Sequence, residues 1–221
     1  RIIYMSTSGT IGVSTDPEAI ATEENIYPTD LVRTWPYYLS KIYAEEEALR
    51  WHRAEGLPIV ILNPTLLLGP GDEDSSSTGD VERFLKGQLP VTARGGMSFV
   101  DVRDVALASV SALTRGEVGE RYLLGGCNVP LNDFFKDLAR MSGRPAPLFS
   151  APASVSKWGA GLLSRLENLG LKSLPVTRID MEMARHGWYI SSEKAQAALG
   201  FDPRDPAETL RDTIDDVEAR I

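Results

Sequence analysis

The sequence has few of the residues that build disulfide frameworks and metal centres. Among 221 residues it contains one cysteine, Cys127, and two histidines, His52 and His186. A single cysteine cannot form an intrachain disulfide, and this scarcity suggests a reducing compartment such as the cytoplasm. So small a set of soft ligands also argues against a thiolate or multi-histidine metal site.

Positive charge and long apolar runs are scarce as well. Lysine and arginine number 23 against 31 aspartate and glutamate residues, which gives a net charge of −8. Phosphate backbones attract basic surfaces, so we expect no nucleic-acid partner. No apolar run approaches the roughly 18 residues that a membrane span needs. The hydrophobic share of 43% and the charged share of 24% are instead typical of a globular domain.

The first part of the sequence predicts a strand, a helix and a second strand. Residues 1–5 are rich in β-branched and aromatic types, which favours a strand, and residues 13–33 predict a long polar surface loop. A helix is expected from Thr34, as its N-cap, to Gly56, a natural stop. The apolar run 57–62 predicts a strand covered on both faces. This order indicates a parallel sheet with a right-handed crossover.

The rest of the sequence continues the alternation of helices and strands. The expected elements are a helix at 75–87, a strand at 98–102, a helix at 102–114, a strand at 121–124 and a helix at 131–142. Beyond Pro152 the pattern is mostly helical, and the last helix, from about Ala207, is acidic and expected at the surface. Asp101, Arg103 and Asp104 at a strand-to-helix turn are expected to fix local structure.

One constellation in the sequence suits hydride-transfer chemistry. Tyr37 and Lys41 are four residues apart on one predicted helix, so their side chains share a face. A carbonyl being reduced needs a proton donor at its oxygen, and an alcohol being oxidised needs an acceptor. Tyrosine can do either, and a nearby ammonium lowers its pKa from about 10. Thr7, in a hydroxyl cluster at the end of the first strand, is placed to hold the substrate oxygen.

The spacing of Tyr37 and Lys41 is weak evidence when taken alone. By chance a chain of this composition would contain roughly 0.2 such pairs. The competing interpretation is a half-buried helix aromatic and a solvated lysine. The strand with its hydroxyl cluster and the apolar strand ending in Asn63-Pro64 favour the chemical interpretation.

Several segments together resemble a known family. They are the stretch 1–12, Tyr37-Tyr-Leu-Ser-Lys41, and the stretches 62–70, 99–106, 119–126 and 143–147. In order and spacing they resemble the extended short-chain dehydrogenases/reductases of the NAD-dependent epimerase/dehydratase group. Within that group the chain is most similar to the dihydroflavonol-reductase-like branch, which includes hopanoid-associated sugar epimerases. The resemblance implies an α/β fold with part of a Rossmann-like parallel sheet and a smaller, mainly helical substrate-binding part.

The resemblance also implies roles for particular residues. Thr7 matches the catalytic Ser or Thr, with Ser6 as the alternative if the register differs by one. Tyr37 matches the general acid/base. Lys41 matches the lysine that binds the nicotinamide ribose and lowers the tyrosine pKa. The implied activity is the interconversion of a secondary alcohol and a carbonyl on a small or sugar-like substrate, as in reductases and epimerases.

Contacts with the implied cofactor, NAD or NADP, map to a second set of positions. Pro64, Thr65 and Leu66 match the strand-end backbone that approaches the nicotinamide, and Ser76 lies where relatives cap a helix near the cofactor. Residues 1–68 would then be the distal part of the cofactor-binding domain. Residues 69–221 would form the substrate-binding part, with 99–115 packing back onto the first.

The sequence departs from the family pattern at its start. The family begins with a glycine-rich turn that cradles the pyrophosphate at a helix N-terminus, followed by a residue that reads the ribose. Neither feature is found, so the sequence is expected to begin near the fifth strand of the sheet, and NAD cannot be distinguished from NADP. A non-catalytic binding or scaffold protein with an incomplete dinucleotide fold is the alternative hypothesis. Residues 1–5 are expected to form an exposed sheet edge, and relatives suggest a homodimer through the helix with Tyr37 and Lys41.

Overall fold

A three-stranded parallel sheet forms one half of the molecule. The computed structural model describes residues 1–221 except 90, 94, 148, 152–182 and 184. The strands are β1 (Ile2–Met5), β3 (Ile59–Pro64) and β7 (Arg121–Leu124), in the order β1-β3-β7. Every residue of β3 is buried, as the apolar run predicted, because β3 is the central strand. The predicted α/β fold with a parallel sheet is confirmed.

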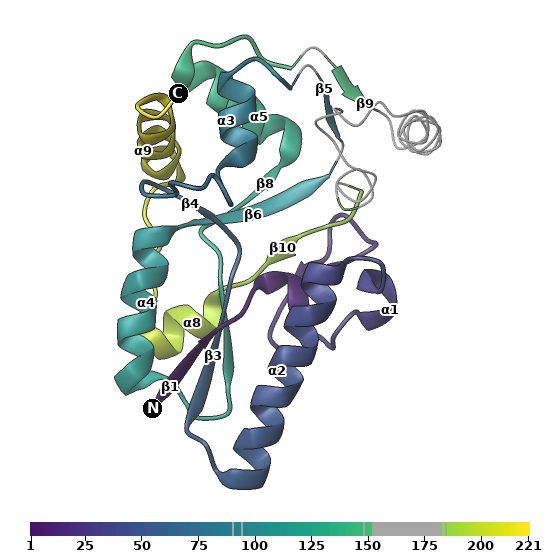
Figure 1. Ribbon diagram of the computed structural model, residues 1–221, viewed down its shortest axis with the longest axis vertical. Coiled ribbons are helices and arrows are strands. Elements are labelled where there is room, and N and C mark those ends of the chain that lie inside the picture. The colour runs from purple at the N-terminus through teal and green to yellow at the C-terminus, as the bar shows by residue number, and fades with distance from the viewer. Residues whose placement is uncertain (90, 94, 148, 152–182, 184) are drawn as a thin grey trace.

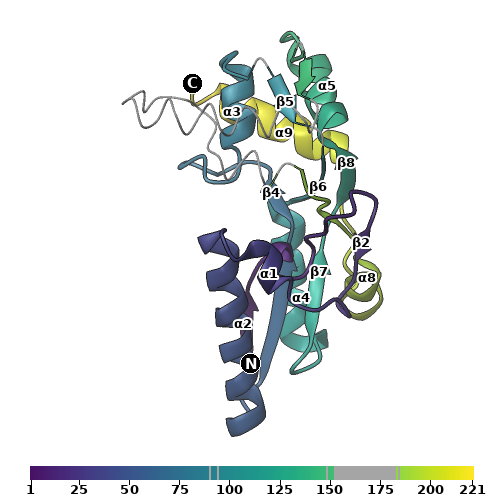
Figure 2. The same ribbon diagram turned by 90° about the vertical axis from the view of Figure 1, so that its right-hand side faces the viewer.

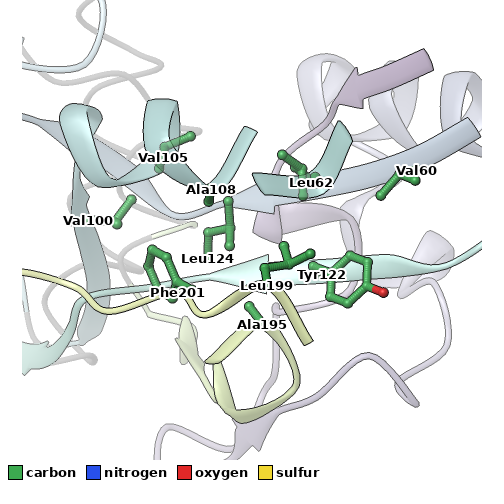
Figure 3. Packing of buried hydrophobic residues seen from close by; sticks show 11 residues of the cluster. Val60, Leu62, Val100, Val105, Ala108, Tyr122, Leu124, Ala195, Leu199 and Phe201 are labelled. Carbon is green, nitrogen blue, oxygen red and sulfur yellow. The ribbon is translucent and has the colours of Figure 1, made fainter. Parts of the chain in front are cut away.

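Helices cover both faces of this sheet (Figures 1 and 2). They are α2 (Pro36–Glu55) on one face, and α4 (Val102–Arg115) and α8 (Glu193–Leu199) on the other. Val60 and Leu62 of β3 and Leu124 of β7 pack with Ala108 of α4 and Leu199 of α8 (Figure 3). Helix α2 ends at Gly56, whose φ of 69° is the left-handed conformation that favours glycine.

A second sheet and three helices form the other half. The strands are β4 (Leu66–Leu68), β6 (Gly96–Asp101) and β8 (Cys127–Pro130), and the helices are α3 (Gly79–Leu85), α5 (Leu131–Ser142) and α9 (Pro206–Glu218). Their core contains Phe84, Phe99, Phe134, Leu210 and Ile214. A short ladder pairs β5 (Val91–Ala93) with β9 (Phe149–Ala151).

The segment 13–33 is largely the surface loop that its composition suggested, but it is not entirely irregular. It follows a short 3-10 helix, η1 (Ser8–Thr10), and contains β2 (Ile20–Ala21) and α1 (Thr29–Val32). Strand β2 pairs with β10 (Tyr189–Ile190). Val13, Ala21 and Val32 are buried, since residues distant in the chain pack on them.

Three other sequence predictions also need correction. The N-cap of α2 is Trp35, without a side-chain cap bond, whereas Thr34 is exposed. Helix α9 has an exposed acidic face, as expected, but the prediction did not include its other face, with Leu210 and Val217, which is buried against the second sheet and α3 and α5. Strand β8 was missed, since its pairing partner β6 lies about thirty residues earlier in the chain.

The turn at the start of α4 has the structural role expected for it. Asp101 is the N-cap of α4 and accepts hydrogen bonds from the backbone N–H and the guanidinium of Arg103. Asp104 binds the guanidinium of Arg204, at 2.8 and 2.9 Å, instead of capping the helix. These ion pairs fasten α4 to the chain just before α9.

The division at residue 68 remains a prediction. Strand β4 already belongs to the second sheet, and β7 and α8 return to the first. Within the described part of the chain, β1 pairs only with β3, so its other side is a sheet edge. The helices expected between 152 and 182 lie outside the described residues. No helix among the described residues is long and apolar enough to cross a membrane.

Candidate active site

The carboxyl ends of β1 and β3 lie side by side and form the floor of the candidate site. Met5 is paired with Leu62 in the parallel register, so Ser6 and Thr7 emerge next to Asn63. The Ser6 N–H donates to the Leu62 carbonyl at 2.8 Å. Ligand sites of open parallel sheets occur at this edge.

Thr7, the second residue after β1, is held in place by hydrogen bonds. Its backbone is extended (φ −153°, ψ 148°), and its hydroxyl oxygen accepts a hydrogen bond from the Gly9 N–H at 3.3 Å, which caps η1. Its carbonyl accepts from the Asn63 amide at 3.0 Å and from the Thr10 hydroxyl at 2.9 Å. The Ser6 hydroxyl, by contrast, is buried and has no hydrogen-bond partner among the described residues.

Tyr37 and Lys41 are one turn apart near the start of α2. Tyr37 is 56% exposed, and the Lys41 ammonium lies 6.0 Å from the centroid of its ring. The next residue, Tyr38, packs its ring directly on Gly9, where an added Cβ would lie 2.1 Å from a ring carbon. The absence of a side chain at Gly9 therefore lets the first turn of α2 lie against the turn that carries Thr7.

The electrostatics around Tyr37 differ from the sequence expectation. Burial of its hydroxyl region by neighbouring protein raises the pKa of Tyr37, and burial raises the pKa of Tyr38 to about 12. The Lys41 ammonium lies 6.0 Å from the centroid of the Tyr37 ring, and its charge does not offset this rise in the pKa of Tyr37. A lowered pKa of Tyr37 thus remains a prediction that requires a positive charge closer to the phenol oxygen.

The residues predicted to contact the cofactor lie in two places. Pro64 ends β3, and both the N–H and the hydroxyl of Thr65 donate to the Leu124 carbonyl, at 3.0 and 3.3 Å. Leu66 begins β4 and is half-buried. Ser76 is in the loop before α3, where its N–H and hydroxyl both donate to Asp72, at 3.1 and 2.9 Å.

Sequence reasoning missed the buried side chains beneath this edge. Glu45 is fully buried and contacts the side chains of Thr10, Asn63 and Tyr27. In the sequence it stands in a run of three glutamates, which is typical of a solvated helix face. The available signal was its position, since it follows Tyr37 by eight residues and Lys41 by four and so shares their face of the helix.

Comparisons with known proteins find related sequences and structures. Residues 1–125 match the model of the "NAD dependent epimerase/dehydratase family". The chain is 32% identical over 220 residues to a putative dihydroflavonol 4-reductase of Synechocystis sp., covering 97% of this chain and 63% of that protein. The crystal structure of gox2253 is 33% identical with a TM-score of 0.84, covering all of this chain and 67% of that one. A nucleoside-diphosphate-sugar epimerase from Pseudomonas aeruginosa is 25% identical with a TM-score of 0.80, covering 99% and 67%.

The matches cover nearly all of this chain but only part of the related proteins. The chain spans 63% of the length of its Synechocystis relative. Solved structures that share the fold at lower identity include complexes with NADPH and with NAD. The family match covers more than half of the chain, and the dihydroflavonol-reductase-like relatives expected from the sequence are found. This chain therefore belongs to the NAD dependent epimerase/dehydratase family.

Proposed function

We propose that the protein containing this chain is an NAD(P)-dependent oxidoreductase or epimerase that interconverts a secondary alcohol and a carbonyl. The observation that carries this proposal is the Tyr37–Lys41 pair on the exposed first turns of α2, packed through Tyr38 and Gly9 against the strand end with Thr7. An acid/base group must reach the substrate, and the 56% exposure of Tyr37 meets this requirement.

Each of the three residues has one role in the proposed reaction. Tyr37 accepts the hydroxyl proton when an alcohol is oxidised and returns it to the carbonyl oxygen in reduction. Lys41 adds the positive charge that favours the phenolate form of Tyr37. The Thr7 hydroxyl donates to the substrate oxygen, while its own oxygen accepts from the Gly9 N–H.

The residues present fit a nicotinamide dinucleotide at this edge. The buried Ser6 hydroxyl after β1 has no hydrogen-bond partner among the described residues, and both donors of Thr65, just after β3, are used by the Leu124 carbonyl. Lys41 would hold the ribose, the backbone of Pro64 to Leu66 would face the nicotinamide, and Ser76 would contribute from the loop before α3. When bound, the dinucleotide supplies or accepts the hydride. The sequence and the structure leave open whether it is NAD or NADP.

The names of two relatives support a proposal for the substrate class. One is named a dihydroflavonol 4-reductase and another a nucleoside-diphosphate-sugar epimerase. We propose that the substrate is a small or sugar-like alcohol or ketone. We also propose that the protein forms a homodimer through α2.

Replacing Tyr37 tests this function. In the natural protein that contains this chain, Tyr37→Phe removes the proton-transferring hydroxyl and keeps the ring. Turnover is expected to fall at least about 100-fold, the low end for acid–base catalysis. The probes are dihydroquercetin with NADPH, followed by loss of NADPH absorbance, and UDP-glucose with NAD, followed by product chromatography.

The control is Tyr43→Phe, an exposed tyrosine on the same helix. It should leave turnover within about twofold of the unsubstituted protein. Near-normal turnover in Tyr37→Phe would overturn the assignment. A protein that neither turns over a probe nor changes NAD(P)H fluorescence on binding would support the alternative, a binding or scaffold protein.

A further inference from the structure

A buried polar network lies directly beneath the residues of the proposed site. Its centre is Glu45, which is fully buried although it is a carboxylate in the middle of α2. Its Oε1 accepts a hydrogen bond from the Asn63 amide and lies 3.1 Å from the Thr10 hydroxyl. Its Oε2 accepts from the Tyr27 hydroxyl at 3.0 Å and lies 3.6 Å from the Arg121 guanidinium. Four separate segments of the chain thus converge on one side chain.

Most donors and acceptors of this network are paired, although Asn63 Oδ1 and Arg121 Nη1 have no hydrogen-bond partner among the described residues. Asn63 has two amide hydrogens, and three acceptors lie within reach of them: Glu45, the Thr7 carbonyl and the Thr10 hydroxyl oxygen. Tyr27 donates its hydrogen to Glu45 and accepts one from Arg121 at 3.1 Å. Arg121 supplies the positive charge that a buried carboxylate requires, and its guanidinium stacks on the Tyr27 ring at 4.8 Å. A neutral amide in place of Glu45 would set an N–H₂ group against one of these donors.

The same network fixes the backbone of Thr7. The Thr7 carbonyl accepts from the Asn63 amide at 3.0 Å, from the Thr10 hydroxyl at 2.9 Å and from the Thr10 N–H at 3.2 Å. The Asn63 amide also donates to Glu45, and the Thr10 hydroxyl, which has a single hydrogen to donate, lies 3.1 Å from the same Glu45 oxygen. The direction of the Thr7 peptide, and with it the position of the Thr7 hydroxyl, therefore depends on where Glu45 holds Asn63 and Thr10.

Helix α2 couples this network to the acid/base pair. Tyr37, Lys41 and Glu45 follow one another at four-residue steps, so they lie along one face of a continuous helix. Tyr37 is exposed and Lys41 half-buried in its first turns, and Glu45 is buried one turn further along the helix. A shift of the Glu45 contacts would change the distance between the helix and the strand end that carries Thr7.

We propose that Glu45 is a positioning residue for the reaction of this site. It acts through Asn63 and Thr10 on the Thr7 peptide, and it sets the Thr7 hydroxyl against the proton-transferring group of Tyr37. Small displacements of catalytic groups lower turnover strongly, which gives a reason to retain a buried carboxylate where an apolar residue would be simpler to accommodate. This inference rests on the proposed function of the site.

A double-mutant cycle tests the coupling in the natural protein that contains this chain. The variants are Glu45→Gln, Thr7→Ala and the two together, with dihydroquercetin and UDP-glucose as probe substrates. Glu45→Gln should lower kcat on the order of 10- to 100-fold and leave the dissociation constant for NADPH, read by its fluorescence, within about twofold. The double variant should be no slower than Thr7→Ala within about twofold, because Glu45 acts through a hydroxyl that is already gone.

Two further variants keep the test decisive. Glu46→Gln changes the same charge on an exposed neighbour and should leave kcat unchanged. Thr10→Val keeps Glu45 paired with Asn63, Tyr27 and Arg121, and it replaces Glu45→Gln in the cycle if the latter does not fold. It removes a single donor to the Thr7 carbonyl and should lower kcat several-fold, again without adding to Thr7→Ala.

The outcomes separate the inference from the proposed function. If kcat per folded molecule is normal in Glu45→Gln, or if its loss multiplies with that of Thr7→Ala, Glu45 has only a structural role and the inference is wrong. If Thr7→Ala and Tyr37→Phe both turn over normally, the proposed function itself is wrong.

Discussion

The loop before α3 offers a quantitative test of how this structure is held together. Asp72 accepts hydrogen bonds from the N–H groups of Ser76, Ser77 and Thr78, at 3.1, 2.8 and 2.8 Å, and from the hydroxyls of Ser76 and Thr78. Asp72→Asn keeps the size of the side chain but turns one acceptor oxygen into a donor that faces donors. The substitution should therefore destabilise the loop that holds Ser76, a predicted cofactor contact.

The magnitude follows from the pKa of Asp72. Burial raises this pKa, but the hydrogen bonds from Thr78, Ser77 and Ser76 together outweigh burial and lower the pKa from 3.8 to about 2. A shift of that size corresponds to roughly 2.5 kcal/mol at 1.36 kcal/mol per unit. Asp72 is half-buried, and solvent screening reduces the expected effect to about 1–2 kcal/mol of unfolding free energy.

The sign of the pH dependence is fixed by the direction of the shift. A pKa that is lower in the folded state stabilises the protein fully above about pH 4, and this stabilisation is lost as the pH falls toward 2. Urea denaturation of the natural protein and of Asp72→Asn should show a constant gap of about 1–2 kcal/mol above pH 4.5. The gap should close in acid.

The matched control is Asp74→Asn, which changes an exposed carboxylate in the same loop. It should show a gap near zero at every pH. The reasoning would be refuted if Asp72→Asn had the same unfolding free energy as the natural protein at neutral pH. It would also be refuted if the difference in unfolding free energy between the two proteins grew in acid.

Two further substitutions test contacts between distant segments. Gly9→Ala should destabilise the protein by about 1–3 kcal/mol and slow turnover, because its methyl would enter the Tyr38 ring; Gly79→Ala, with open space around it, is the control and should be nearly neutral in urea denaturation. Arg204→Ala should cost about 2–4 kcal/mol in the same measurement, since it leaves the buried carboxylate of Asp104 with only a backbone partner. An Arg204→Ala protein as stable as its parent would show that this ion pair does not stabilise the fold.

Local sequence signals were sufficient where a segment's own residues decide its structure. The apolar run that became β3 has no polar side chain to place at a surface before Asn63, so burial on both faces was predictable. Gly56 ends α2 because it adopts a left-handed conformation at little cost. The four-residue spacing of Tyr37 and Lys41 placed them on one helix face.

Other features depended on residues far away in the chain. Val32 is buried because residues of α2 and of the segment near Trp188 pack on it, and nothing in the polar stretch 13–33 shows that. In α9, by contrast, the apolar residues Leu210 and Val217 do recur with helical spacing, which predicts a buried face. The many acidic residues of the helix drew attention away from this spacing.

The clearest division between sequence and structure is found at Glu45. The sequence by itself determined that Glu45 is on the same helix as Tyr37 and Lys41, the proposed acid/base pair, since helical spacing is a local property. Only the tertiary structure decided that Glu45 is buried while Glu46 and Glu47 are exposed. The physical reason is that a buried carboxylate needs donors and a counter-charge, and these come from Asn63 and Arg121, which the parallel sheet brings to α2 from distant positions in the chain.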